Sequence, residues 1–148
     1  MRFRFSNRLA LSMLNQFKIE NGELIMKKNV VKEKSFAFAL RTVKLCRYLN
    51  NEKREFVLSK QLLRSGTAIG ALVREAEQAE SKADFIHKMA IALKEANETD
   101  YWIELLFQSD TINKKEYDSI HPEIIELCKL LTSIIKTSRQ QFKMENGK

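Results

Sequence analysis

The stretch Gln61–Phe107 constrains the fold most, because its apolar residues recur every three or four positions over two long segments. Ser81–Asp84 resembles a capping box with Asp in place of the usual Glu, which predicts a helix start at Ser81. Ser59 is a suitable N-cap for the preceding segment. The sequence therefore predicts a helical hairpin made of helices 59–80 and 81–108.

Two further helices are expected on either side of this hairpin. One covers about residues 34–50, and the last opens at His121-Pro122, because proline fits the first helical position. Only one Pro and four Gly occur in 148 residues, which favours helices over a sheet rich in tight turns. The sequence predicts an all-α fold: an antiparallel up-down-up-down four-helix bundle over residues 26–148.

Residues 1–25 differ from the rest of the chain in their weak periodicity, and Asn21-Gly22-Glu23 is expected to separate them from the bundle. Gly22-Glu23 can be encoded by a ribosome-binding sequence just upstream of Met26. We therefore hypothesise that residues 1–25 are an extension or a disordered arm and that Met26 is the true start. An amphipathic N-terminal arm is the alternative, and the intact mass of the natively expressed protein distinguishes the two.

The expected environment is the cytoplasm, without a membrane. No apolar run approaches the roughly 20 residues that a membrane span needs. Cys46 and Cys128 lie among apolar residues without a CxxC motif or metal-ligand spacing. We interpret both as buried thiols in a reducing compartment.

No catalytic site, cofactor or metal site is predicted. Glu95 and Glu98 lie on one helix, but the Glu-x-x-His pairs of a di-iron bundle are missing. His87 and His121 lie outside any such pattern. Nothing in the sequence specifies a cleft with paired carboxylates.

The net charge of +7 favours an anionic partner: nucleic acid, an anionic membrane surface or an acidic protein. Solubility is the simpler explanation. On the predicted helix 34–50, basic residues and one aromatic residue gather on the face opposite the apolar arc, a composition that suits contact with phosphates. A solvated helix face is the alternative. This basic strip consists of Lys34, Arg41, Lys44 and Tyr48.

Helix 34–50 has apolar residues over more than half of its circumference, which is wider than the stripe that one bundle core needs. The excess suggests that a second chain covers this helix. On the next helix, Gly66 and Gly70 share the predicted core face with Leu62 and Leu63, and this glycine pair predicts close approach of another backbone. The wide arc on helix 34–50 comprises Phe36, Phe38, Ala39, Leu40, Val43, Leu45, Cys46 and Leu49.

Two stripes beside the core faces of the hairpin have the composition of helix–helix contacts. One has small residues between opposite charges, and the other combines Trp102 with an isoleucine and two glutamates. We expect these glutamates to pair with Arg64 or Lys94. The predicted oligomer-interface residues are Arg64, Ala68, Ala71, Glu75, Ile91, Glu95, Glu98 and Trp102.

The segments QLLRSGTAIGALVREA and SKADFIHKMAIALKEANETDYWIELL resemble the four-helix-bundle family encoded in intervening sequences of bacterial 23S ribosomal RNA genes, over about residues 34–139. The resemblance implies a bundle that closes into a ring, typically a homopentamer. A related branch, the accessory protein of diversity-generating retroelements, forms a basic pentameric barrel that binds nucleic acid and a reverse transcriptase. The matching positions are Gln61, Arg64, Ser65, Ile69, Glu75, Asp84, Phe85, Lys88, Lys94, Glu95, Glu98, Thr99, Tyr101 and Trp102.

Two departures from the family pattern are Ala68 and Leu72, which stand where the family usually has Ser and Asn. The fold tolerates loss of a buried polar group whose partner is also gone, but an activity that needs the Asn is in doubt. We expect a non-enzymatic ring that associates with RNA or DNA. The alternative is a protein-interaction scaffold for a partner such as a reverse transcriptase, and an enzyme is the third reading.

Overall fold

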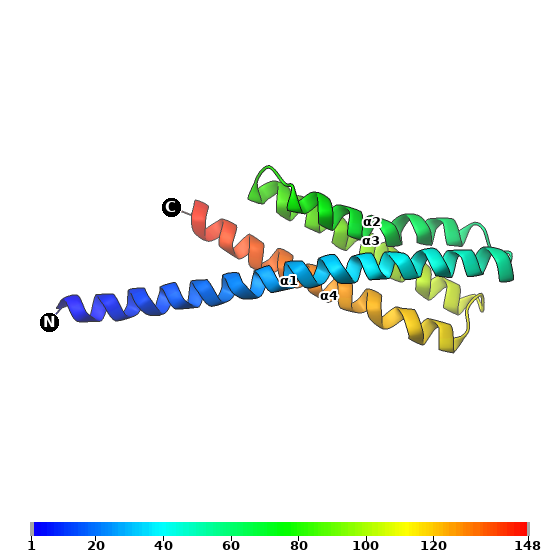
Figure 1. Cartoon of the computed structure of the whole chain (residues 1–148), viewed down its shortest axis with the longest axis horizontal. Coiled ribbons are helices and arrows are strands. Elements are labelled where there is room, and N and C mark those ends of the chain that lie inside the picture. Colours follow the sequence, from blue (N-terminus) through cyan, green and yellow to red (C-terminus); the bar gives the residue numbers. More distant parts are fainter. Residues whose placement is uncertain (1, 148) are drawn as a thin grey trace.

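The computed structural model describes the backbone of residues 2–147 and the side chains of residues 8–147. Its four helices are α1 (Arg2–Glu52), α2 (Leu58–Glu77), α3 (Lys82–Gln108) and α4 (Lys114–Asn146), and residues 2–147 contain no strand. Figure 1 shows the α2–α3 hairpin lying along α1, with α4 completing the bundle. The predicted all-α four-helix bundle is confirmed.

Contacts between neighbouring helices run in opposite directions along the chain. Between α1 and α4, Arg41 pairs with Glu123, and Lys27 donates to Ser133. Between α2 and α3, Arg64 pairs with Glu98, and Glu75 pairs with Lys88. Between α3 and α4, Asp100 lies beside His121, and Lys82 pairs with Glu145. In each pair of helices a later residue on one meets an earlier residue on the other, as in an antiparallel up-down-up-down bundle.

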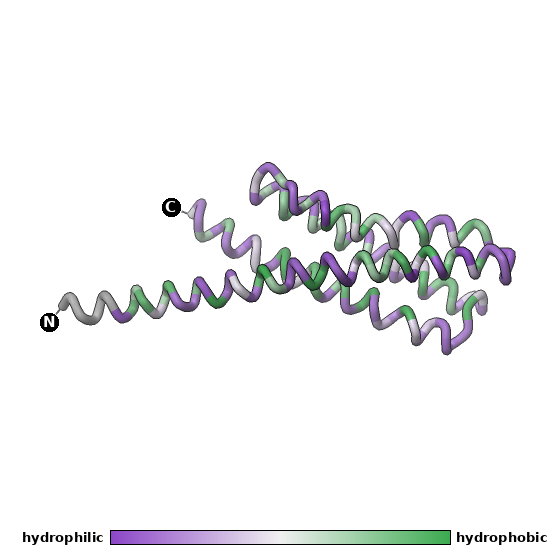
Figure 2. The backbone as a smooth tube through the Cα atoms, viewed as in Figure 1, coloured by the Kyte–Doolittle hydropathy of each residue, from purple (hydrophilic) through white to green (hydrophobic). Residues whose placement is uncertain are grey.

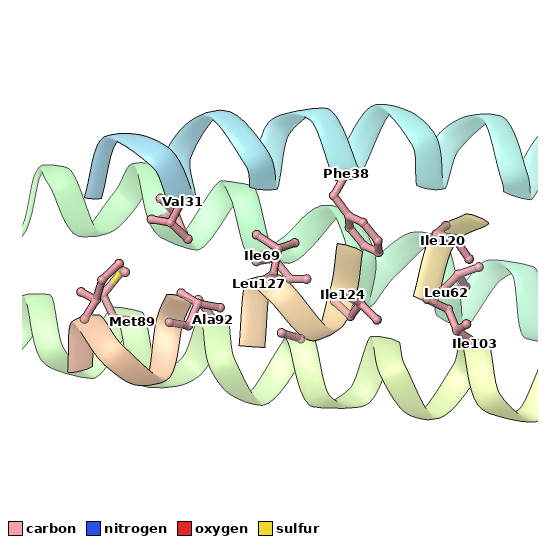
Figure 3. Close-up of a cluster of buried hydrophobic side chains, with 14 of the residues drawn as sticks. Val31, Phe38, Leu62, Ile69, Met89, Ala92, Ile103, Ile120, Ile124 and Leu127 are labelled. Atoms are coloured by element: carbon pink, nitrogen blue, oxygen red, sulfur yellow. The ribbon is translucent and has the colours of Figure 1, made fainter. Parts of the chain in front are cut away.

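The core is built from rows of residues spaced alternately three and four positions apart, which is the pattern of knobs-into-holes helix packing. Figure 3 shows Val31 and Phe38 of α1 pointing towards side chains of the other three helices. The buried apolar positions of the α2, α3 and α4 rows are Leu62, Ile69, Val73, Ala76, Met89, Ala92, Ala96, Ile103, Leu106, Ile120, Ile124, Leu127, Leu131 and Ile134.

Helix α1 is longer than the predicted helix 34–50. It runs unbroken through Asn21-Gly22-Glu23, where the sequence predicted a break, and α4 packs on this segment: Gln141 donates to Asn21 at 2.9 Å, and Leu24 is buried. Figure 1 shows the N-terminal part of α1 projecting past the other helices, and Figure 2 shows hydrophobic residues recurring along this part. The choice between Met1 and Met26 as the start stays a prediction.

The two glycines of α2 lie where α1 approaches most closely. A Cβ added at Gly66 would lie 2.8 Å from Cγ2 and 2.9 Å from Oγ1 of Thr42, and one at Gly70 would lie 3.4 Å from the backbone oxygen of Ser35. Ser35 and Thr42 are themselves buried. The predicted close approach is confirmed, since small residues on both helices let the backbones come together.

The start of α3 is as predicted, and the start of α2 is not. Ser81 caps α3, with its side chain accepting a hydrogen bond from the backbone N–H of Asp84 at 3.0 Å. The prediction of Ser59 as the N-cap of α2 was wrong. Ser59 is buried inside the helix, and its hydroxyl contacts Asn50 and the backbone oxygen of Glu55.

The cap of α2 is the carboxylate of Glu55, which accepts hydrogen bonds from the backbone N–H groups of Val57, Leu58 and Ser59. Burial by itself raises the pKa of Glu55, but these hydrogen bonds outweigh it and hold the pKa below its usual value. This cap was not predicted, because Glu55 lies two residues before Val57 and its side chain reaches forward to the start of the helix.

We expect the E55A variant to be less stable than the wild type by about 0.5–2 kcal/mol, the usual value of an N-cap. Because the folded-state pKa is lowered, this contribution is complete above the unfolded value of 4.5 and is lost as pH falls through the folded pKa. Urea unfolding at neutral and acidic pH measures it. A difference between the two proteins that stays constant down to pH 3 would contradict the role of the charged carboxylate.

The predicted start of α4 at His121-Pro122 was wrong by just over two turns. The helix begins after Asn113, whose side chain accepts from the backbone N–H of Glu116 while the Glu116 carboxylate accepts from the backbone N–H of Asn113. This complete capping box precedes Pro122, which therefore lies inside the helix. None of the helices in residues 2–147 is long and apolar enough to cross a membrane.

Candidate functional site

The predicted basic strip lies along the groove between α1 and α4, and glutamates of α4 neutralise much of it. Lys34 pairs with Glu126 at 2.7 Å. Arg41 pairs with Glu123, and its guanidinium also donates to the backbone oxygen and the hydroxyl of Ser119. Lys34 and Arg41 therefore contribute to the contact between α1 and α4.

Tyr48, the aromatic member of the strip, donates its hydroxyl hydrogen to Glu116 at 2.7 Å. This hydrogen bond raises the pKa of Tyr48. Lys44 is exposed and forms no ion pair with the described side chains. Lys44 and Tyr48 line an open groove of about 780 Å³ between the two helices. The structure thus brings the four predicted residues together but leaves mainly Lys44 for an external phosphate.

The predicted stripes of α2 and α3 form one connected network. Arg64 of α2, one of the two partners that the sequence offered, pairs with both Glu95 and Glu98 of α3. The indole N–H of Trp102 donates to Glu98 at 3.2 Å. At the other end of the hairpin, Glu75 pairs with Lys88 at 3.2 Å. The remaining predicted interface residues lie between these two groups: Ala68, Ala71 and Ile91.

Buried polar groups add to the contact between α2 and α3. The hydroxyl of Thr99 donates to Ser65 at 3.0 Å, and both side chains are fully buried. At the two departures from the family pattern, Ala68 is half-buried and Leu72 packs against the core. The apolar replacements therefore sit beside apolar surroundings and leave the Ser65–Thr99 pair intact.

Three apolar side chains of α1 and α2 that the sequence placed in the wide arc or on a core face are exposed, and we call them the apolar patch. Phe36 and Leu40 are each 50% exposed, and Leu63, which the sequence placed on a core face, is 38% exposed. Arg74 covers one side of Phe36, with its guanidinium carbon 5.1 Å from the ring centre. The wide arc on the predicted helix 34–50 contained the signal for this patch, because one bundle core uses only part of that arc.

A polar cluster between α3 and α4 was not predicted. Its rings stack in a column, in which Tyr117 lies 4.3 Å from Phe107 and 4.5 Å from His121. Tyr117 donates to Glu104 at 2.6 Å, and this bond raises the pKa of Tyr117 to about 12. His121 Nε2 lies 3.0 Å from Asp100 Oδ1, but without the alignment of a hydrogen bond, so that oxygen has no hydrogen-bond partner among the described residues.

The chemistry available to these side chains is limited by their protonation. Cys46 is buried as predicted, whereas Cys128 is only half-buried. Burial raises the pKa of both thiols to about 11, so neither supplies a thiolate near neutral pH. Among the described residues, no group of three or more His, Cys, Asp or Glu side chains is arranged to hold a metal ion.

Comparison with known families gives a match over residues 27–133 to the model described as 23S rRNA-intervening sequence protein. The chain belongs to this family. The match spans the bundle, from α1 to the second half of α4. Most of the family positions that match in the sequence make contacts within the α2–α3 hairpin. These contacts are the ion pairs of Arg64, the Ser65–Thr99 hydrogen bond, the Glu75–Lys88 ion pair and the N-cap hydrogen bond from the backbone of Asp84 to Ser81.

A solved structure supports the same assignment. The chain is similar to a protein of unknown function from the S23 ribosomal protein family of Bacteroides thetaiotaomicron VPI-5482, with 61% sequence identity and a TM-score of 0.73. The similarity covers 74% of this chain and 98% of that one. No curated protein matches the chain. Family membership and fold are thus established together.

Proposed function

We propose that this family member is a non-enzymatic protein that assembles into a ring and associates with nucleic acid. The observation that carries the proposal is the exposure of three apolar side chains on the outside of α1 and α2: Phe36, Leu40 and Leu63. Exposed apolar patches on a soluble chain mark interaction sites. Burial of a Phe or Leu side chain stabilises an interface by about 1.5–3 kcal/mol.

Ring closure needs two different surfaces on each chain, because head-to-tail contacts pair unlike patches. The apolar patch supplies one surface on α1 and α2. The second is the α2–α3 stripe that ends in Trp102, a residue type enriched where interfaces are strongest. We expect the patch of one chain to dock against the stripe of the next. Family resemblance gives the expected number of chains as five.

Assembly also concentrates charge. Each full chain has a net charge of +7, and a chain that starts at Met26 has +5, so a ring of five carries about +35 or about +25. A field of this size attracts nucleic acid strongly and in a salt-dependent way, through release of counterions from the phosphate backbone. The non-enzymatic part of the proposal is supported by the protonated thiols and by the cluster between α3 and α4, where Tyr117 and Glu104 are bonded to one another.

Light scattering on the purified protein tests assembly. We expect a mass of about five chains for the wild type and dissociation to monomers in the F36Q/L40Q variant, because both changes remove apolar surface from the patch. The L9Q/M13Q variant is the matched control: it removes two apolar side chains that are more exposed than Phe36 and Leu40 from the projecting part of α1 and should keep the ring. A monomeric wild type contradicts the proposal.

Binding of RNA and DNA across a salt series tests the second part. We expect binding near 50 mM salt that weakens about 10³-fold or more by 200 mM if at least six phosphates are contacted. Absence of binding at low salt to both nucleic acids would defeat this part of the proposal, whatever the mass of the assembly.

A protein-interaction scaffold is the second candidate, and one observation favours it. Tyr101 is 58% exposed and packs edge-on against Trp102 at 5.0 Å, beside Arg64. Tyr, Trp and Arg are the residues most often found at the energetic centre of protein interfaces. Capture of a protein from nuclease-treated lysate by the wild type but not by Y101A would favour this function, and capture that depends on intact nucleic acid would disfavour it.

A further inference from the structure

Helix α4 carries acidic and basic residues on different parts of its surface. Its glutamates near α1 form the pairs with Lys34 and Arg41 described above. From residue 127 to residue 144 the sequence contains no Asp or Glu, although basic residues recur there. All of these basic residues are exposed, and they form the α4 basic stripe: Lys129, Lys136, Arg139 and Lys143.

The spacing places the α4 basic stripe on one side of the helix. Lys129, Lys136 and Lys143 are seven residues apart, which is close to two full turns, and Arg139 lies three residues after Lys136. The opposite side of the same turns is buried in the core through Leu131, Ile134 and other residues. The stripe therefore extends about 21 Å along the outside of the bundle.

No carboxylate among residues 8–147 forms an ion pair with any residue of the α4 basic stripe. This distinguishes the α4 basic stripe from the basic strip on α1, where Lys34 and Arg41 form ion pairs with glutamates of α4. Formation of a phosphate contact at Lys34 or Arg41 must first break an existing pair, whereas a contact at the α4 basic stripe breaks none. The stripe therefore offers cations that are not held in ion pairs, although Lys143 shares a groove with Glu20 and Glu23 of α1.

The stripe also borders a groove. Lys136, Arg139 and Lys143 line a hollow of about 320 Å³, together with Thr132 and Gln140. Leu93 of α3 and Ile135 form its apolar part. The side chains available to a ligand are therefore cations interleaved with a hydroxyl and an amide, arranged along a line.

We propose that the α4 basic stripe and its groove bind the backbone of double-stranded RNA, an inference that rests on the proposed association with nucleic acid. A line of cations about 21 Å long matches an extended polyanion better than a single small anion. No aromatic side chain lines the groove, so it lacks the stacking platform of single-strand binding sites.

Thr132 and Gln140 favour RNA over DNA. The Thr132 hydroxyl donates to the backbone oxygen of Cys128 at 2.7 Å, which leaves its lone pairs free to accept a hydrogen bond. The 2′-hydroxyl of ribose is both donor and acceptor, and proteins recognise duplex RNA through 2′-hydroxyl and phosphate contacts. Cations next to such groups fit an RNA backbone, whereas DNA lacks the 2′-hydroxyl that could donate to Thr132.

Fluorescence anisotropy with an RNA duplex of about 16 base pairs tests the inference on the full chain. The K136Q/R139Q/K143Q variant should lose affinity at least about tenfold near 50 mM salt. Its plot of log affinity against log salt should be shallower by about 2–3, the contribution of three lost phosphate contacts. Circular dichroism melting verifies that the variant folds, which we expect because all three residues are exposed.

The K34Q/R41Q/K44Q variant is the matched control, since it removes the same charge from the α1 strip. It should retain most of the affinity. Equal losses in both variants would show that only net charge matters and would overturn the inference, while leaving nucleic-acid association standing. A wild type without binding at low salt would overturn both.

A DNA duplex of the same sequence tests the choice of RNA. We expect the wild type to bind the RNA duplex more tightly, and the T132A/Q140A variant to lose this preference while its affinity for DNA stays unchanged. Equal or tighter binding of DNA by the wild type would overturn the assignment to RNA.

Discussion

Replacement of Phe38 by alanine is expected to destabilise the bundle by about 3–5 kcal/mol, the largest effect that we expect of a single substitution. Phe38 is 1% exposed, and its side chain points from α1 towards side chains of the other helices, as Figure 3 shows. Its removal takes away apolar surface buried on all sides and leaves a cavity that rigid helices fill only in part. Equilibrium unfolding in urea measures the change in free energy.

The F36A variant is the control for this prediction, since it removes the same side chain two residues earlier on α1. Phe36 points to the outside, so we expect the stability of the isolated chain to change by less than about 0.5 kcal/mol. Its effect should fall on assembly. A loss of chain stability in F36A as large as that in F38A would show that the two faces of α1 are not distinguished as the structure describes.

Replacement of Gly66 by valine is expected to destabilise the bundle by about 1–3 kcal/mol, through overpacking between α1 and α2. The added Cβ would lie 2.8 Å from a carbon of Thr42, closer than van der Waals contact permits. Thr42 is buried, branched at Cβ and hydrogen-bonded to the backbone oxygen of Phe38 at 2.9 Å, so it cannot turn away freely. Thermal and urea unfolding measure the loss.

Two further variants identify the cause. In G66V/T42A the atoms nearest the new side chain are gone, so part of the lost stability should return, and the two changes should not be additive. At Gly70 an added Cβ meets its nearest atom only at 3.4 Å, so G70A should change stability by no more than about 1 kcal/mol, with the gain in helix propensity offsetting the tighter contact. No recovery in the double variant would contradict the proposed clash.

The sequence was informative wherever one helix carries its own signal. The three-and-four spacing of α2 and α3 predicted the hairpin, and Ser81 predicted the start of α3 through a local side-chain cap. Gly66 and Gly70 predicted a close helix contact because glycine inside a helix is unfavourable unless something approaches. Charge and spacing predicted Arg64 or Lys94 as the partner of the two glutamates, and the structure shows Arg64 in that role.

The wrong predictions concern residues whose structural role depends on a second residue at another position in the chain. Ser59 looked like a cap, but Glu55 reaches the helix end first. His121-Pro122 looked like a start, but the stronger capping box at Asn113 lies earlier. Leu63 has the spacing of a core residue, yet α1 and α3 do not cover its position. Such cases depend on competition between sites, which periodicity does not record.

The sequence by itself determined the all-α class, the order of the helices and the rows of core residues, because helix periodicity and caps are local properties of the chain. Only the tertiary structure decided which charges are available. Lys34 and Arg41 looked like a free basic strip until the packing of α4 against α1 placed glutamates beside them. The α4 basic stripe forms no ion pair with a carboxylate among residues 8–147, although Lys143 shares a groove with Glu20 and Glu23 of α1. Charge compensation acts between helices across the fold, and spacing along one helix does not reveal it.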